Sequence, residues 1–73
     1  MTAAALSLDC LGVRCPLPII ELARRLPEVP VGAIVEMLAD DPAAEPDVAA
    51  WCRMRGHELV SAEPPRFWVQ RSH

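Results

Sequence analysis

The sequence predicts an α+β domain, a two-layer α/β sandwich in which two helices cover one face of a four-stranded mixed sheet. Several short segments alternate apolar and polar residues, as half-buried strands do. Two longer segments carry apolar residues at spacings of three and four, as amphipathic helices do. These segments follow the order β-α-β-α-β-β, which suits two packed layers. The 73 residues suffice for a single domain, expected to be ordered from about residue 6 to residue 71.

The first half of the chain supplies one strand and one helix. Residues 1–5 are expected to form a frayed start, and the alternation over residues 6–9 is typical of a short strand. Gly12 permits an unusual backbone angle in the loop that follows. A helix is expected from about Pro16 to Glu28, because apolar residues recur there on one stripe. The members of this stripe are Ile19, Leu22, Ala23 and Leu26.

The second half supplies a strand, a helix and a hairpin. A strand is expected over residues 33–39, followed by a turn over 40–42 whose aspartates offer an N-cap. The second helix should begin within residues 43–47 and end just before Gly56, which suits the position after a last helical turn. The remaining elements are two strands, over 57–63 and 66–71, separated by a turn of two prolines.

Composition and charge exclude several classes of function. The net charge is −3 and the basic residues are scattered, so the chain lacks the basic stripe of a nucleic-acid-binding protein. No apolar run approaches the roughly 20 residues of a membrane helix. Residues 1–8 lack the features of a secretory signal, so we expect a cytoplasmic protein without a membrane partner. A domain of this size has a thin core, so we expect neither a deep cavity nor a cofactor.

The cysteines are Cys10, Cys15 and Cys52, an odd number that fits free thiols better than a disulfide framework. They form no Cys-x-x-Cys pair, and His57 adds too few ligands nearby, so no metal site is expected. Cys52 falls on the apolar face of the second helix, which favours a packing role. His57 is expected at the surface, where a carboxylate such as Glu58 could engage it.

The segment over 14–18, Arg-Cys-Pro-Leu-Pro, is the most informative motif. Proline is tolerated in a first helical turn, because those N–H groups have no intrahelical acceptor. Pro16 and Pro18 therefore fit the first and third helical positions, with Cys15 as the N-cap. The free N–H groups, the helix dipole and Arg14 would then stabilise a thiolate and lower the pKa of the cysteine. Such a cysteine is a nucleophile.

Each candidate residue also has a plainer interpretation. Cys15 could be an inert N-cap, but cysteine caps helices poorly compared with Ser, Thr, Asp or Asn, so the reactive interpretation is favoured. Cys10 could resolve a modified Cys15 as a disulfide, although a small apolar residue at a strand end is the more frequent case. Arg14, Arg24 and Arg25 could form a basic patch for an acidic partner, although solvated surface charges are commoner.

The two tryptophans have different expected roles. Trp51 is expected in the core. Phe67 and Val69 point to one face of the last strand and Trp68 to the other. If Phe67 and Val69 face the helices, Trp68 lies on the open face of the sheet, where it forms a partner surface or only covers the bare sheet.

The segment over 8–18, Leu-Asp-Cys-Leu-Gly-Val-Arg-Cys-Pro-Leu-Pro, resembles the signature of the TusA/SirA-like sulfur carriers, whose hallmark is a Cys-Pro-x-Pro motif opening the first helix. Residues 39–43 resemble the family's Asp-Asp-Pro turn before the second helix. Residues 51–52 and 56–59 resemble the end of that helix and the start of the third strand. The resemblance spans residues 6–71.

This resemblance implies a β-α-β-α-β-β domain whose motif cysteine, here Cys15, accepts sulfane sulfur as a persulfide and hands it on, supported by Pro16 and Pro18. It implies a cysteine desulfurase or rhodanese-type donor. It also implies a DsrE-type or other acceptor in tRNA thiolation, molybdenum cofactor assembly or sulfur metabolism. Leu17 stands where the tRNA-thiolation branch tends to carry an acidic residue, which leaves the branch open.

Two other function classes remain beside a covalent carrier. In a redox-sensing or regulatory module, Cys15 would be oxidised to a sulfenic acid and trapped by Cys10. In a pure interaction module, Cys15 would be replaceable. The carrier hypothesis is favoured, since a carrier needs little more than an accessible thiol and a docking surface, and no general base stands near Cys15 in the sequence.

Overall fold

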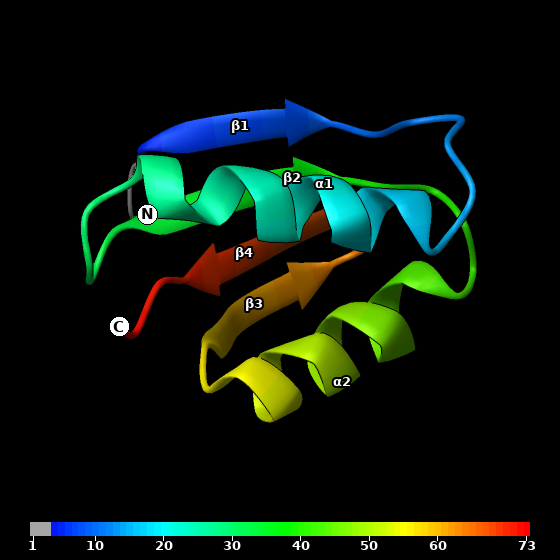
Figure 1. The fold of residues 1–73 in the computed structure, drawn as a ribbon. Helices are drawn as coiled ribbons and strands as arrows, with labels where there is room; N and C mark the ends of the chain where they lie inside the picture. Colours follow the sequence, from blue (N-terminus) through cyan, green and yellow to red (C-terminus); the bar gives the residue numbers. More distant parts are fainter. Residues whose placement is uncertain (1–3) are drawn as a thin grey trace.

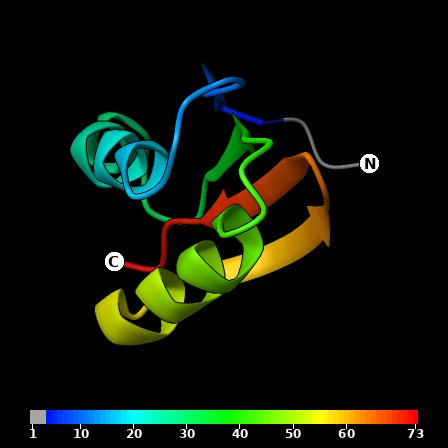
Figure 2. The ribbon, with the colours of Figure 1, turned by 90° about the vertical axis from the view of Figure 1, so that its right-hand side faces the viewer.

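The computed structural model describes residues 4–73, and its fold class is the predicted one. Four strands, β1 (Leu6–Asp9), β2 (Ile34–Leu38), β3 (Glu58–Glu63) and β4 (Arg66–Gln70), form one sheet in the order β1-β2-β4-β3. β1 runs parallel to β2, and β4 is antiparallel to both β2 and β3. Figures 1 and 2 show the two helices, α1 (Leu17–Arg25) and α2 (Ala44–Arg55), on one face of this mixed sheet.

The first helix differs from its expected form at its end and along its buried stripe. The α-helix stops at Arg25, and a 3₁₀ turn continues to Glu28. Pro27 accounts for this change, because it has no N–H to donate to an α-helical acceptor. Ala23 was expected to be buried and is exposed. It is turned about 100° from Leu22, outside the contact stripe. That stripe consists of Pro18, Ile19, Leu22 and Leu26.

The core lies between the helices and one face of the sheet. The central strands contribute Val35, Met37, Phe67 and Val69, each at most 1% exposed. Trp68 pairs in register with Glu36 on the opposite face and is partly exposed, as expected once Phe67 and Val69 face the helices. The cluster as a whole comprises Leu8, Cys10, Ile19, Leu22, Leu26, Val29, Val35, Met37, Ala39, Ala44, Val48, Cys52, Phe67 and Val69.

The two ends of the chain show one correction. A frayed start was expected over residues 1–5, of which residues 1–3 lie outside the described part of the chain. This expectation is wrong for Ala5, whose N–H donates to the carbonyl of Ile34 at 2.8 Å. This bond continues the parallel pairing of β1 with β2, so the pairing begins one residue before the strand. At the other end, Arg71 donates to the carbonyl of Val29 at 2.6 Å and ties residues after β4 to the loop after α1.

Candidate functional site

Cys15 lies in the loop that joins β1 to α1, at the edge of the sheet where β1 and β2 both end. Parallel strands place their carboxyl ends at the same edge, so the loop after β1 lies beside the turn after β2 (Figure 1). Both helices also begin at this edge. Segments about 26 residues apart in the sequence are therefore brought together around one thiol.

Three aspartates hold the backbone of this loop. Asp9 Oδ1 accepts from the N–H of Leu11 at 3.1 Å, and Asp40 Oδ1 accepts from the N–H of Gly12 at 2.9 Å. Asp41 Oδ2 accepts from the N–H of Cys15 itself at 3.1 Å. Gly12 has a φ of +76°, a conformation in which glycine is free of Cβ strain. The loop is thus fastened at successive points to the sheet edge and to the turn after β2.

The predicted helix start is displaced by one residue. The N-cap is Pro16 rather than Cys15, and its carbonyl accepts from Ile19 and Ile20 at 3.0 Å. Pro18 occupies the second helical position, where its missing N–H has no intrahelical acceptor to lose. The Cys15–Pro16 peptide bond is cis. Cys15 therefore stands just outside the helix.

The prediction of an acidic thiol is also wrong. Burial raises the pKa of Cys15 above its usual value, and the charges of Asp41 and Asp47 raise it further. Asp47 lies in the first turn of α2. The stabilisation was expected from Arg14 and the start of α1, but burial and the carboxylates of the neighbouring turn and helix raise the pKa instead. Sequence proximity could not reveal them, and only the Asp-Asp pair before the second helix hinted at them.

Cys10 sits at the other end of the loop and is 5% exposed. Its side chain belongs to the core cluster, and burial raises its pKa, with Glu21 and Asp9 adding to the effect. This environment is that of a small apolar residue at a strand end. A resolving role for Cys10 stays a prediction.

An exposed apolar surface adjoins Cys15. Leu17, between the two prolines, is 56% exposed, and Ile20, one turn later, is 55% exposed. Both line a groove of about 410 Å³ between β1 and α1, together with Val13 and Cys10. The site therefore combines a partly buried thiol with apolar side chains that face outward.

Arg24 and Arg25 are surface charges paired with carboxylates, the favoured interpretation, and do not join Arg14 in the alternative basic patch. Arg24 pairs with Glu21 at 2.6 Å, and Arg25 pairs with Glu28 at 2.7 Å and with Glu21 at 3.7 Å. These pairs neutralise both arginines on the surface of α1. Arg14 is exposed beside Cys15.

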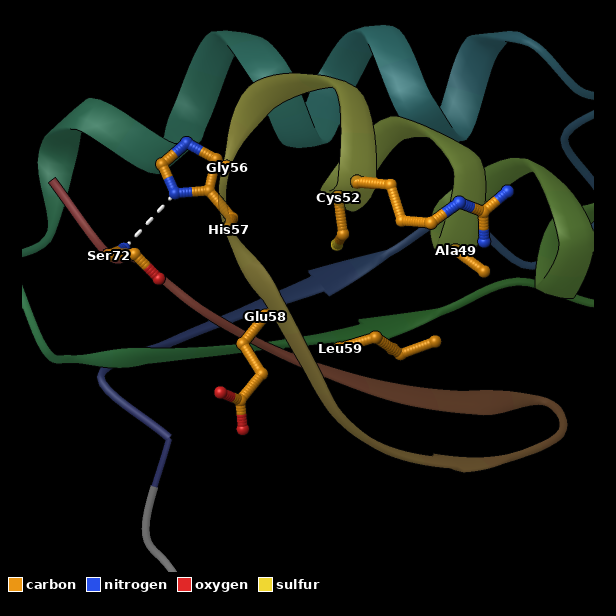
Figure 3. A pocket seen from close by; sticks show the side chains of 8 residues that line it. Ala49, Cys52, Gly56, His57, Glu58, Leu59 and Ser72 are labelled. Carbon is orange, nitrogen blue, oxygen red and sulfur yellow. Dashed lines mark hydrogen bonds between the residues drawn. The ribbon is translucent and has the colours of Figure 1, made fainter.

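Cys52 and His57 lie away from Cys15, at the far end of α2. Burial raises the pKa of Cys52 to about 11, in keeping with its predicted packing role. His57 does not engage Glu58. Its ring stacks between those of Trp51 and His73, with ring centroids 5.5 and 4.6 Å away. Its Nδ1 accepts from the N–H of Ser72 at 3.1 Å, as Figure 3 shows at the rim of a hollow.

Residues 4–73, the described part of the chain, hold neither a metal cluster nor a membrane span. They contain no group of three or more His, Cys, Asp or Glu side chains arranged to hold a metal ion. Within the same residues, no helix has the length and apolar character needed to cross a membrane.

The fold and the site define a class of protein: a small α+β domain that presents a Cys-Pro-x-Pro cysteine on a fastened loop. The family model described as sulfurtransferase TusA matches residues 6–70. A relative from Archaeoglobus fulgidus, named "Putative sulfur carrier protein", is 46% identical over 55 residues, which cover 75% of this chain and 71% of the relative. The chain belongs to the TusA family.

A solved structure supports the fold independently. The crystal structure of a SirA-like protein from Desulfitobacterium hafniense matches with a TM-score of 0.66 at 24% identity. The match covers 88% of this chain and 90% of that one. The two-layer arrangement is therefore that of a SirA-like protein.

Proposed function

We propose that this protein is a sulfur carrier in which Cys15 accepts sulfane sulfur as a persulfide and transfers it to a thiol of a partner protein. The observation that carries the proposal is the placement of Cys15. Its thiol lies on a loop whose backbone is held by hydrogen bonds, beside exposed apolar side chains, in a chain of the TusA family.

The transfer step balances without a further reactant. The Cys15 sulfur attacks the outer sulfur of a donor persulfide, R–S–SH, and a new S–S bond forms as the donor S–S bond breaks. The inner sulfur of the donor leaves with the electron pair and takes up the proton that Cys15 gives up. The products are Cys15–S–SH and R–SH, and the reverse chemistry passes the sulfur to an acceptor thiol.

The fitting partners are proteins that carry their own reactive cysteines. A cysteine desulfurase or a rhodanese-type protein fits the donor, and a DsrE-type or other thiol protein fits the acceptor. Leu17 is apolar and more than half exposed, so we propose that apolar contacts contribute to docking. The pathways open to such a carrier are tRNA thiolation, molybdenum cofactor assembly and sulfur metabolism.

Intact mass measurement tests this function. The wild-type protein, incubated with a cysteine desulfurase and cysteine or with glutathione persulfide, should gain one sulfur atom. Cys15→Ala should gain none, and Cys10→Ala should gain sulfur as the wild type does. The proposal fails if the wild type gains no sulfur from either donor, or if Cys15→Ala gains as much as the wild type.

Peroxide treatment separates this function from the redox-sensing alternative. The burial of Cys10 argues against rapid disulfide formation with Cys15. Under peroxide, a Cys10–Cys15 disulfide should therefore form more slowly than the persulfide loads. The opposite order would favour a redox sensor.

A further inference from the structure

Asp41 makes contacts that no other side chain of the site makes. Its Oδ2 accepts from the N–H of Cys15 at 3.1 Å, while its Oδ1 accepts from the N–H of Ala43 at 2.8 Å. The backbone carbonyl of Asp41 accepts from the N–H of Ala44, the first residue of α2, at 2.9 Å. One residue thus joins the motif cysteine to the start of the second helix.

We propose that Asp41 is the positioning residue of the sulfur site: its single carboxylate fixes the backbone of Cys15 relative to the start of α2 and so determines where the sulfur is presented. This role rests on the proposed sulfur-carrier function. Asp40 does not share it, because Asp40 holds Gly12, three residues before the cysteine.

The charge of Asp41 acts on the same sulfur. The groups that raise the pKa of the thiol by their charge are Asp41 from the turn, Asp47 from α2 and Cys10 just after β1. Burial is the largest cause that raises the pKa of Cys15, and Asp41 is the next. The pKa of Asp41 is itself lowered by its bonds from Ala43 and Cys15 and by the charge of Arg14, so it stays ionised at neutral pH. The resting sulfur is therefore held as a thiol.

The first test is the pH profile of Cys15 alkylation by iodoacetamide, measured by peptide mass in Asp41→Asn. Cys10 and Cys52 are buried, so the modified peptide reports on Cys15. Asparagine keeps the shape of the side chain and removes its charge. The midpoint of the Cys15 alkylation rate against pH should therefore shift to lower pH, and alkylation at neutral pH should become faster. Glu45→Gln is the matched control. It removes one exposed charge from the first turn of α2, four residues after Asp41, and should leave the profile unchanged.

The second test uses the wild-type protein and does not depend on how a variant folds. The amide resonances of Cys15 and Ala43 should titrate together in NMR spectra, with one midpoint below the ordinary aspartate pKa of about 3.9. Separate midpoints would overturn the positioning role, and so would an Asp41→Asn profile that superimposes on the wild type. Neither test involves sulfur loading, so a protein that passes both and gains no sulfur would contradict only the proposed function.

Discussion

At the scale of single residues, the chemistry of Cys15 is set by its neighbours in space more than by its neighbours in sequence. The residues beside it are a cation and a proline, which suggested an acidic thiol. The residues across from it are Asp41 and Asp47, which oppose a negative charge on sulfur. Burial and these two carboxylates act in the same direction, while the charge of Arg14 acts on Asp41.

A pH dependence of sulfur reactivity follows from the raised pKa of Cys15. The thiolate is the nucleophile, so the rate of alkylation should keep rising above pH 9.0, the ordinary pKa of a cysteine thiol. Iodoacetamide rates measured between neutral pH and about pH 10.5, side by side with those of a short cysteine peptide, will check this. The peptide should reach its plateau first. A plateau for Cys15 at lower pH than for the peptide would contradict the raised pKa.

Of two residues in the site, the role of one could be predicted from the sequence and the role of the other could not. Cys15 could be chosen as the reactive thiol, because its motif lies along the chain. Asp41 could be assigned only a helix-capping role, because its bond to Cys15 depends on the parallel pairing of β1 and β2. A contact between two loops becomes visible only when the strands that carry them are placed side by side.

At the scale of elements, the end of a helix could be predicted where one residue type by itself stops the helix, as glycine does. Gly56 ends α2 with a φ of +77°, and its N–H donates to the carbonyl of Cys52 at 2.9 Å. The start of α1 was harder to predict, because prolines fit several first-turn positions and the choice depends on which carbonyl becomes the first acceptor. The start of α2 shows the same limit. Its N-cap is Ala43, and Asp41 bonds the N–H of that residue instead of capping the helix.

Replacing Gly56 by alanine should destabilise the domain. A Cβ at this left-handed position costs about 1–2 kcal/mol, and it would make an ordinary van der Waals contact with the His73 ring at 3.4 Å. Thermal unfolding of Gly56→Ala against the wild type measures the loss. Gly12→Ala is the matched control, since its φ is +76° and a Cβ there would meet nothing within 4 Å. An equal loss in both variants would show that the His73 contact contributes nothing.

At the scale of the whole molecule, the layers and the order of elements could be predicted from periodicity alone, because each amphipathic element has one face to bury. The stack of Trp51, His57 and His73 could not. It assembles the end of α2, the residue before β3 and the segment after β4, three places that are joined only in the folded chain. The sequence indicated His57 only as a surface residue.

This stack should make global stability depend on pH. Burial lowers the pKa of His57 below 6.5, and the charges of His73 and Arg71 lower it further. The unfolded chain then binds the proton more readily, so the stabilising contribution is fully present above about pH 6.5 and falls as the pH drops through the folded value. Urea unfolding at pH 7.5 and pH 5 will measure this loss.

The matched variant for this dependence is His57→Phe, which keeps an aromatic ring in the stack and cannot titrate. The difference between its stabilities at the two pH values should be smaller than in the wild type. An unchanged difference would assign the pH dependence to other groups.

The edge position of β1 has a mechanical consequence. β1 is an edge strand that pairs in parallel with β2 alone, whereas β2, β4 and β3 form an antiparallel series. The loop that carries Cys15 thus joins an edge strand of the sheet to the helix that follows it. Proteins open locally where the fewest contacts must be broken. The pairing of β1 with β2 joins four residue pairs, against five in each of the other two pairings, so we expect opening to begin at this edge. Under the proposed function, opening at this edge would release the loop that holds Cys15 while the other three strands stay paired.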